Sequence, residues 1–248
     1  MAKVLIIGGH GRVALQLERI LAERGDEVDA VIRNPDHVDE VADTGANPVV
    51  ADIEELDVAG LAELITGHDA VVWSAGAGGG NPVRTRAVDH DAAVRSMDAA
   101  EQAGVRRYVM VSYFGSRTDH RVPADSAFRH YADAKADADE HLRASRLDYT
   151  ILGPSTLTDG SGTGAIDASG DHSSEVDRAD VAAVAAAALA ARARSGAPSD
   201  STAATPRSRK PSGRRHERDL PQAQPQGGRR RARHRRAELV RARARRGR

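Results

Sequence analysis

The chain has 248 residues with 36 basic and 36 acidic side chains, so its formal net charge is zero. The charges are unevenly placed, because residues 1–191 hold 17 basic and 32 acidic side chains whereas residues 192–248 hold 19 and 4. The absence of cysteine excludes disulfides, thiolate metal sites and a cysteine nucleophile. We therefore expect an acidic globular domain over 1–192, followed by a basic tail over 193–248 whose aperiodic, Arg-rich composition predicts disorder.

Short apolar runs alternate with helical patterns along residues 1–152. The predicted strands are Lys3–Ile7, Glu27–Ile32, Pro48–Ala51, Ala70–Trp73, Arg107–Ser112 and Tyr149–Leu152. The predicted helices are Arg12–Arg24, Pro35–Asp43, Val58–Ile65, Arg84–Ala103, Ala124–Ser145 and Asp177–Arg192. Residues 153–176 are rich in Gly, Ser, Thr and Asp and are expected to form a long loop over a ligand site, with a merely flexible loop as the equal alternative. This alternation predicts the α/β class: a Rossmann-like, doubly wound parallel sheet in a three-layer α/β/α arrangement.

The first predicted strand is followed at once by a glycine turn. The turn fits G-x-G-x-x-A as Gly9, Gly11 and Ala14, and fits G-x-x-G-x-x-A equally well if Gly8 is the first glycine. Such a turn lets the backbone approach a pyrophosphate, and the following helix offers free amides and a positive dipole end. A plain tight turn is the alternative, but the strand–turn–helix context favours dinucleotide binding. The expected contacts come from Gly8, Gly9, His10, Gly11, Arg12 and Val13.

The residue after the second predicted strand indicates which dinucleotide is bound. An NAD site usually has Asp or Glu there for the ribose 2′-hydroxyl, whereas this chain has Arg33, whose guanidinium suits a 2′-phosphate. The sequence therefore favours NADP(H) and leaves NAD(H) possible, since Arg33 could also be a solvated loop charge. Further cofactor contacts are expected after the third and fourth strands, from Asp52, Ile53, Ser74, Ala75 and Gly76. Each of these could equally be a turn residue.

Tyr131 and Lys135 form a Tyr-x-x-x-Lys pair on a predicted helix. Residues four apart share a helix face, so both side chains can point at one ligand. A compact ammonium can lower the pKa of a neighbouring phenol, which would then exchange protons near neutral pH. Ser112 ends the fifth predicted strand, where open α/β sheets bind ligands, and its hydroxyl could polarise a carbonyl. The alternatives are an ordinary surface helix, since Asp133, Asp137 and Asp139 surround the pair, and a capping serine.

The glycine turn, Asp52, the Arg107–Ser112 strand, the Tyr-x-x-x-Lys pair and Leu147–Leu152 together resemble the atypical short-chain dehydrogenase/reductases over residues 1–191. They are most similar to the NAD(P)H-binding subgroup whose members are often named NAD-dependent epimerase/dehydratase.

The resemblance implies a role for each candidate catalytic residue. Tyr131 would be the general acid/base, Lys135 would hold the nicotinamide ribose and tune the tyrosine, and Ser112 would orient the substrate carbonyl. Asp89 stands where the wider family has Asn and would hold a structural water. Gly153 stands where Arg is common, which removes a contact.

The basic tail supports two interpretations. Dense arginine binds nucleic acid without sequence preference, through counterion release, so no specific nucleic-acid partner is expected. Alternatively, a coding string for Ser199–Pro211 read two bases later can give GLYGGDTPIAEA, which resembles the family's C-terminal stretch. We hypothesise that residues from about 193 onward come from a shifted reading frame, which would leave the sheet without a terminal strand and with an unpaired edge.

The sequence thus predicts an NADP(H)-dependent oxidoreductase or epimerase-like enzyme. A hydride would pass between the nicotinamide and the carbonyl or alcohol carbon of an unidentified small substrate. The alternative is a non-catalytic NADP(H)-binding sensor of the same fold. The scattered histidines predict no metal site. No apolar run is long enough for a membrane span or a signal peptide, so a soluble cytoplasmic protein without a membrane partner is expected.

Overall fold

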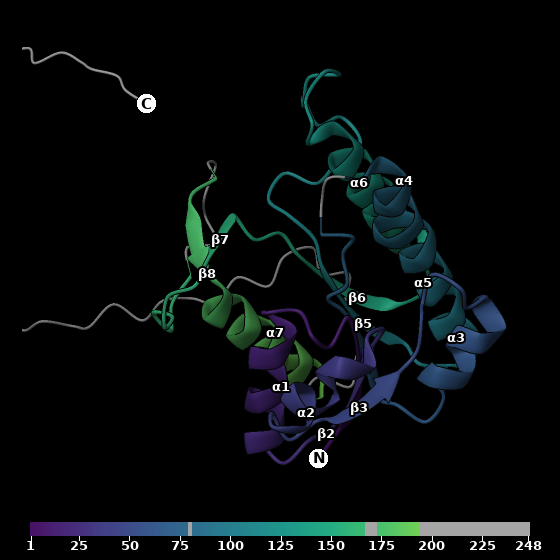
Figure 1. Ribbon diagram of the computed structural model, residues 1–248, viewed down its shortest axis with the longest axis vertical. Helices are drawn as coiled ribbons and strands as arrows, with labels where there is room; N and C mark the ends of the chain where they lie inside the picture. Colours follow the sequence, from purple (N-terminus) through teal and green to yellow (C-terminus); the bar gives the residue numbers. More distant parts are fainter. Residues whose placement is uncertain (79–80, 167–172, 194–248) are drawn as a thin grey trace, which may run out of the picture. The chain divides into compact units, whose positions relative to one another are not determined.

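The computed structural model describes residues 1–78, 81–166 and 173–193. Its centre is a six-stranded sheet in which every pairing is parallel. The strands are β1 (Lys3–Ile7), β2 (Glu27–Ile32), β3 (Asn47–Val50), β4 (Ala70–Trp73), β5 (Arg107–Val111) and β6 (Asp148–Leu152). Their order, 3-2-1-4-5-6, confirms the predicted Rossmann-like sheet and places its switch point between β1 and β4 (Figure 1).

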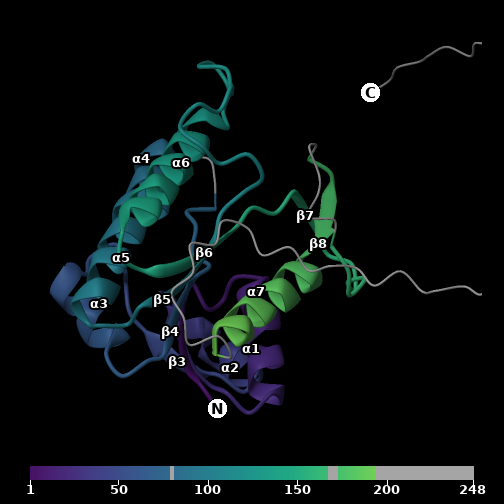
Figure 2. The ribbon, with the colours of Figure 1, turned by 180° about the vertical axis from the view of Figure 1, so that it is seen from behind.

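Helices cover both faces of the sheet, as Figure 2 shows from behind. One face carries α1 (Ala14–Glu23), α2 (Val38–Ala42) and α7 (Arg178–Ala193); the other carries α3 (Val58–Ile65), α5 (Ala93–Gln102) and α6 (Arg129–Ala144). The central strands are apolar throughout because both of their faces are buried. In β1, for example, Ile6 packs into the core beneath α1 and α7, whereas Leu5 packs into the core beneath α3, α5 and α6.

The structure changes four predicted segments. The helix expected over Pro35–Asp43 is a 3-10 turn (Pro35–His37) followed by α2. The helix expected over Arg84–Ala103 is a short α4 (Pro82–Thr85), a π-helical stretch (Arg86–Ala92) and then α5. The helix expected from Ala124 begins at Arg129, because residues 123–128 form hydrogen-bonded turns after Pro123. The loop expected over 153–176 contains a small parallel pair, β7 (Thr156–Thr158) with β8 (Glu175–Asp177).

The described part of the chain contains no helix that combines the length and apolar character needed to cross a membrane. The disorder predicted for the tail concerns residues that lie, apart from the end of α7 at Ala193, outside the described ranges.

Candidate functional site

The glycine turn lies at the carboxyl end of β1 and leaves no room for side chains. The amides of Gly8 and Gly9 both donate to the carbonyl oxygen of Val31, at 3.1 and 2.9 Å. Gly8 has φ +91°, and a Cβ there would lie 2.5 Å from the amide nitrogen of Ala75. A Cβ on Gly11 would lie 3.1 Å from the Gly8 oxygen. The turn therefore exposes bare backbone at the switch point, as a pyrophosphate requires.

Helix α1 starts directly from this turn. Its N-cap, Val13, makes no side-chain capping bond, and the first turn of the helix contains no acidic residue. The amide of Leu15 donates to the oxygen of Gly11 at 2.9 Å, so the helix is closed from that point on. The backbone amides before Leu15 have no carbonyl partner within the helix. They form the positive end of the helix dipole, which attracts phosphate.

Gly9 has a packing role in the structure. A Cβ at Gly9 would lie 2.7 Å from the Cβ of Ala30 on β2, and the residue is buried. It lines neither of the two cavities described next, and the cofactor contact expected from Gly9 stays a prediction.

Two adjoining cavities collect the other predicted site residues. A cavity of about 310 Å³ is lined by Gly8, His10, Gly11, Arg33, Asp52, Ile53, Ser74, Ala75 and Gly76. A cavity of about 630 Å³ is lined by Gly11, Arg12, Val13, Asp89, Ser112, Tyr131 and Lys135. The two share Gly11 and the Ser74–Gly76 segment after β4. A dinucleotide could therefore span both, with its diphosphate at Gly11, one nucleoside beside Arg33 and the other beside Tyr131.

Arg33 lies at the mouth of the smaller cavity with its side chain half exposed. It pairs with Glu54 at 2.9 Å, and Arg84 pairs with the same carboxylate oxygen at 3.1 Å. His10 stacks on His37, with ring centroids 3.4 Å apart, in the same cavity. Two guanidinium groups thus share the Glu54 carboxylate in this cavity, which Asp52 also lines.

The side chain of Arg12 forms an ion pair. Its Nη1 atom lies 2.6 Å from Asp159, and Arg178 at the start of α7 contacts the other oxygen of Asp159 at 2.6 Å. Both arginines line the larger cavity. An entering phosphate would therefore compete with the exposed Asp159 carboxylate for Arg12.

Lys135 and Tyr131 project from α6 into the larger cavity. The Lys135 ammonium is fully buried and donates to the carbonyl oxygen of Val111 at 2.9 Å. Burial lowers the pKa of Lys135, and the negative charges of Asp89 and Asp139 partly offset this.

The pKa of Tyr131 is shifted in the direction opposite to that expected. Burial raises the pKa of Tyr131 strongly, and Asp89 and Asp139 raise it further, so the expected lowering by Lys135 is not found in the protein alone. The phenol is therefore neutral near pH 7 and holds a proton that it can donate.

Asp89 is placed by the π-helical stretch, a feature that often marks functional positions. One of its oxygens accepts a hydrogen bond from the amide of Ala77 at 3.1 Å, and a Cβ on Gly76 would lie 3.2 Å from the other. That second oxygen, Oδ1, is buried and has no partner among the described residues. Burial raises the pKa of Asp89, and the nearby Lys135 lowers it in part.

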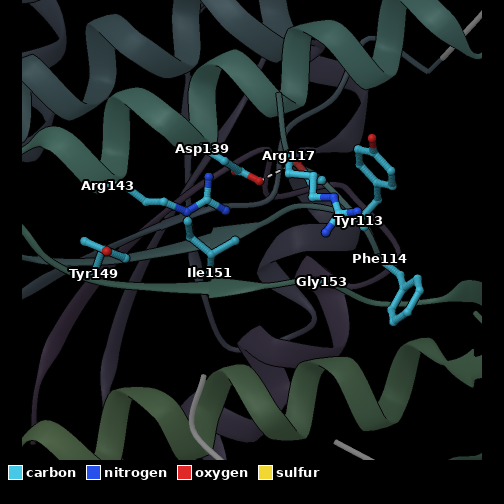
Figure 3. Close-up of a pocket in the computed structure, with 10 residues that line it drawn as sticks. Tyr113, Phe114, Arg117, Asp139, Arg143, Tyr149, Ile151 and Gly153 are labelled. Carbon is cyan, nitrogen blue, oxygen red and sulfur yellow. Dashed lines mark hydrogen bonds between the residues drawn. The ribbon is translucent and has the colours of Figure 1, made fainter. Parts of the chain in front are cut away.

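Asp139 lies at the site, although the sequence names it only in support of the alternative of an ordinary surface helix. It is fully buried, and its Oδ2 atom accepts from the Ser112 hydroxyl at 2.6 Å and from Ser116 at 2.5 Å. Figure 3 shows it on α6 directed at the loop that follows β5, with Arg143 one turn further along the helix. Its spacing of four from Lys135 could have indicated the shared face.

Comparison with known proteins identifies the family. The sequence profile of a family described as NAD(P)H-binding matches residues 8–192. The chain belongs to this NAD(P)H-binding family of atypical short-chain dehydrogenase/reductases. The match covers nearly all of the region over which the resemblance was predicted.

The chain is also similar to several individual proteins. UPF0659 protein YMR090W of Saccharomyces cerevisiae is 35% identical over 165 residues, which cover 65% of this chain and 73% of that protein. The uncharacterized sugar epimerase YhfK of Bacillus subtilis is 33% identical over 171 residues, covering 68% and 78%. The crystal structure of the oxidoreductase ylbE from Lactococcus lactis has 30% identity and a TM-score of 0.67, covering 76% and 84%.

Proposed function

We propose that this family member is an NADP(H)-dependent oxidoreductase or epimerase-like enzyme that acts on a small carbonyl or alcohol substrate. The observation that carries the proposal is that Asp89, Ser112, Tyr131 and Lys135, from three separate parts of the fold, line one cavity with the glycine turn. The names of its relatives, an oxidoreductase and a sugar epimerase, agree with this class.

The residues that line the two adjoining cavities fit a nicotinamide dinucleotide. The bare backbone at Gly8 and Gly11 would hold the diphosphate, and the guanidinium of Arg33 would contact a 2′-phosphate in place of Glu54. When bound, the nicotinamide would supply or accept the hydride. Lys135 lies in the cavity that would hold this end of the cofactor.

Tyr131 is the proposed proton donor. The phenol is protonated near neutral pH, and the developing alkoxide of a reduced carbonyl needs a proton. The raised pKa in the protein alone makes this phenol a weaker acid than a free tyrosine. Ser112 donates its hydroxyl proton to Asp139, so its oxygen remains free to accept a hydrogen bond from a substrate hydroxyl. To donate to a substrate carbonyl, Ser112 must first turn away from Asp139.

Replacing Tyr131 with Phe tests the proposal. With NADPH saturating and a turned-over aldehyde as substrate, we expect kcat to fall by about 100-fold or more, since the proton donor is lost. Tyr149→Phe is the control, because Tyr149 lies on β6 outside the larger cavity. Unchanged turnover in Tyr131→Phe, or an equal loss in Tyr149→Phe, would remove Tyr131 from the mechanism.

A non-catalytic sensor of NADP(H) is the second candidate. The hydrogen bond from Ser112 to Asp139 favours it, because the serine proton is then not available to a substrate carbonyl. This alternative predicts tight NADPH binding with no oxidation of NADPH across a panel of aldehydes and ketones. Measurable turnover of any member of the panel that Tyr131→Phe abolishes would exclude it.

A further inference from the structure

A second large cavity opens beside the proposed catalytic residues. It has a volume of about 1100 Å³, and Ser112 and Tyr131 line both cavities. Its titratable wall residues other than tyrosine are basic: Arg117, His120, Arg121 and Arg178. Among the residues that the structure describes, no acidic side chain lines it. This is unexpected in a domain whose acidic side chains outnumber its basic ones almost twofold.

Among the residues that the structure describes, Arg121 is the basic residue of this wall for which no ion pair is found. Arg117 pairs with the exposed Asp119 at 2.9 Å, and Arg178 pairs with Asp159 at 2.6 Å. Arg121 is exposed and forms no ion pair within the described ranges.

The backbone on both sides of Arg121 is fixed to α6. The ring of His120 hydrogen-bonds to Asp133 at 2.9 Å, and Arg129 donates to the carbonyl oxygen of Val122 at 2.8 Å. Arg129 also pairs with Asp133 at 2.9 Å, which joins the two anchors. An unpaired guanidinium on an anchored segment, at the edge of a cavity, is suited to bind a carboxylate or a phosphate.

Aromatic rings form the part of the cavity wall nearest the reaction. Tyr113, Phe128 and Tyr131 pack together with ring centroids 5.2 to 5.6 Å apart, and Phe128 is 44% exposed. An exposed aromatic surface beside the candidate proton donor would cover the planar or apolar part of a ligand.

We infer that the substrate carries a carboxylate or phosphate that binds Arg121, on an apolar or planar body that packs against Phe128 and Tyr113. The inference rests on the proposed function, because it places the reacting carbon at Tyr131 and Ser112. The anionic group is then the feature by which the site selects its substrate.

Binding to the NADP⁺-saturated protein tests this without requiring turnover. The probes are 4-formylbenzoate and its neutral methyl ester, with 4-formylphenyl phosphate and 4-methoxybenzaldehyde as the phosphate pair, each titrated by calorimetry. We expect at least one anionic probe to bind about tenfold or more tightly than its neutral partner, as a charge-assisted hydrogen bond provides. Arg121→Gln should abolish that preference and leave the affinity of the neutral probes unchanged.

Arg106→Gln is the matched control, because it removes an exposed positive charge just before β5, at the end of this strand opposite to Ser112. The preference should survive in this variant. Equal affinities within both pairs, or a preference that Arg121→Gln retains, would overturn the inference while the proposed function stands. If the wild-type protein binds no nicotinamide nucleotide, the proposed function fails and the inference with it.

Discussion

Gly8 is the residue of the glycine turn whose position depends most directly on the absence of a side chain. Its positive φ is shared with Gly25, but the two differ in their surroundings. A Cβ on Gly8 would collide with backbone atoms of Ser74 and Ala75, whereas a Cβ on Gly25 would meet nothing within 4 Å. Comparing substitutions at Gly8 and Gly25 therefore separates the free-energy cost of backbone strain from the cost of placing a methyl group against Ser74 and Ala75.

We expect Gly25→Ala to lower the free energy of unfolding by about 1 kcal/mol, from strain alone. Gly8→Ala should lower it by about 2 kcal/mol more, because backbone must move to admit the methyl group, and should also abolish NADPH binding. Urea denaturation and calorimetric titration of the two variants measure these effects. Equal stabilities and unchanged NADPH affinity in Gly8→Ala would show that the turn does not hold the cofactor.

Individual site residues were predictable to the extent that local pattern determines their place. Ser112 and Lys135 follow from a strand end and a helix spacing, and both line the larger cavity. The burial of Asp139 depends on how α6 packs against the loop after β5, which a sequence pattern does not contain. The direction of the pKa shift of Tyr131 likewise depends on burial and on two carboxylates from distant segments.

Helix α1 carries a buried acid that links it to the segment after α2. Glu18 is fully buried and accepts a hydrogen bond from the Thr44 hydroxyl at 3.0 Å, while its Oε1 has no partner in the described part of the chain. Burial raises the pKa of Glu18 to about 7, although Thr44 and Arg19 act in the opposite direction. The folded state therefore favours the protonated form of this side chain.

The stabilising contribution of Glu18 is complete below its unfolded pKa of 4.5 and is lost as the pH rises toward 7. Glu18→Gln should therefore be more stable than the wild type at pH 8, by about 2–3 kcal/mol, and should lose this advantage by pH 4. Glu23→Gln, an exposed position on the same helix, should show no such difference. Urea denaturation between pH 4 and pH 8 measures it, and a pH-independent difference in Glu18→Gln would contradict the assigned cause.

The regular elements could be predicted from sequence, whereas the irregular ones could not. The strands of the sheet are buried apolar runs that hydrophobic pattern detects, and each predicted strand agrees with the structure to within one residue at either end. The π-helical stretch that carries Asp89 has the same composition as a helix, so periodicity gives no sign of it. Strands β7 and β8 have three residues each, which is too short for an alternating pattern to be recognised.

At the scale of the whole chain, the domain and the tail differ in charge and in their relation to known proteins. The family match ends at residue 192, where the excess of basic residues begins. Within the described ranges, β6 pairs only with β5, and every residue of β6 is partly exposed. An edge strand of this kind can accept a further strand.

The hypothesis of a shifted reading frame is tested by the nucleotide sequence. We expect one alternative frame over the codons for residues 199–211 to encode GLYGGDTPIAEA, and the same frame to continue into a strand and a helix. A protein carrying the restored frame should be more stable in urea than the 248-residue chain, because the added strand would cover the edge of β6. If no alternative frame encodes that stretch, the hypothesis is wrong and the basic tail belongs to the protein.

The proposed function depends on binding of a nicotinamide dinucleotide in the two cavities between the glycine turn and α6. Calorimetric titration of the folded full-length protein with NADPH and NADH measures this directly. We predict saturable binding of both, tighter for NADPH, with Arg33→Gln weakening NADPH binding about tenfold or more and leaving NADH binding nearly unchanged. Absence of binding heat with either nucleotide, for protein shown to be folded by circular dichroism, would contradict the account.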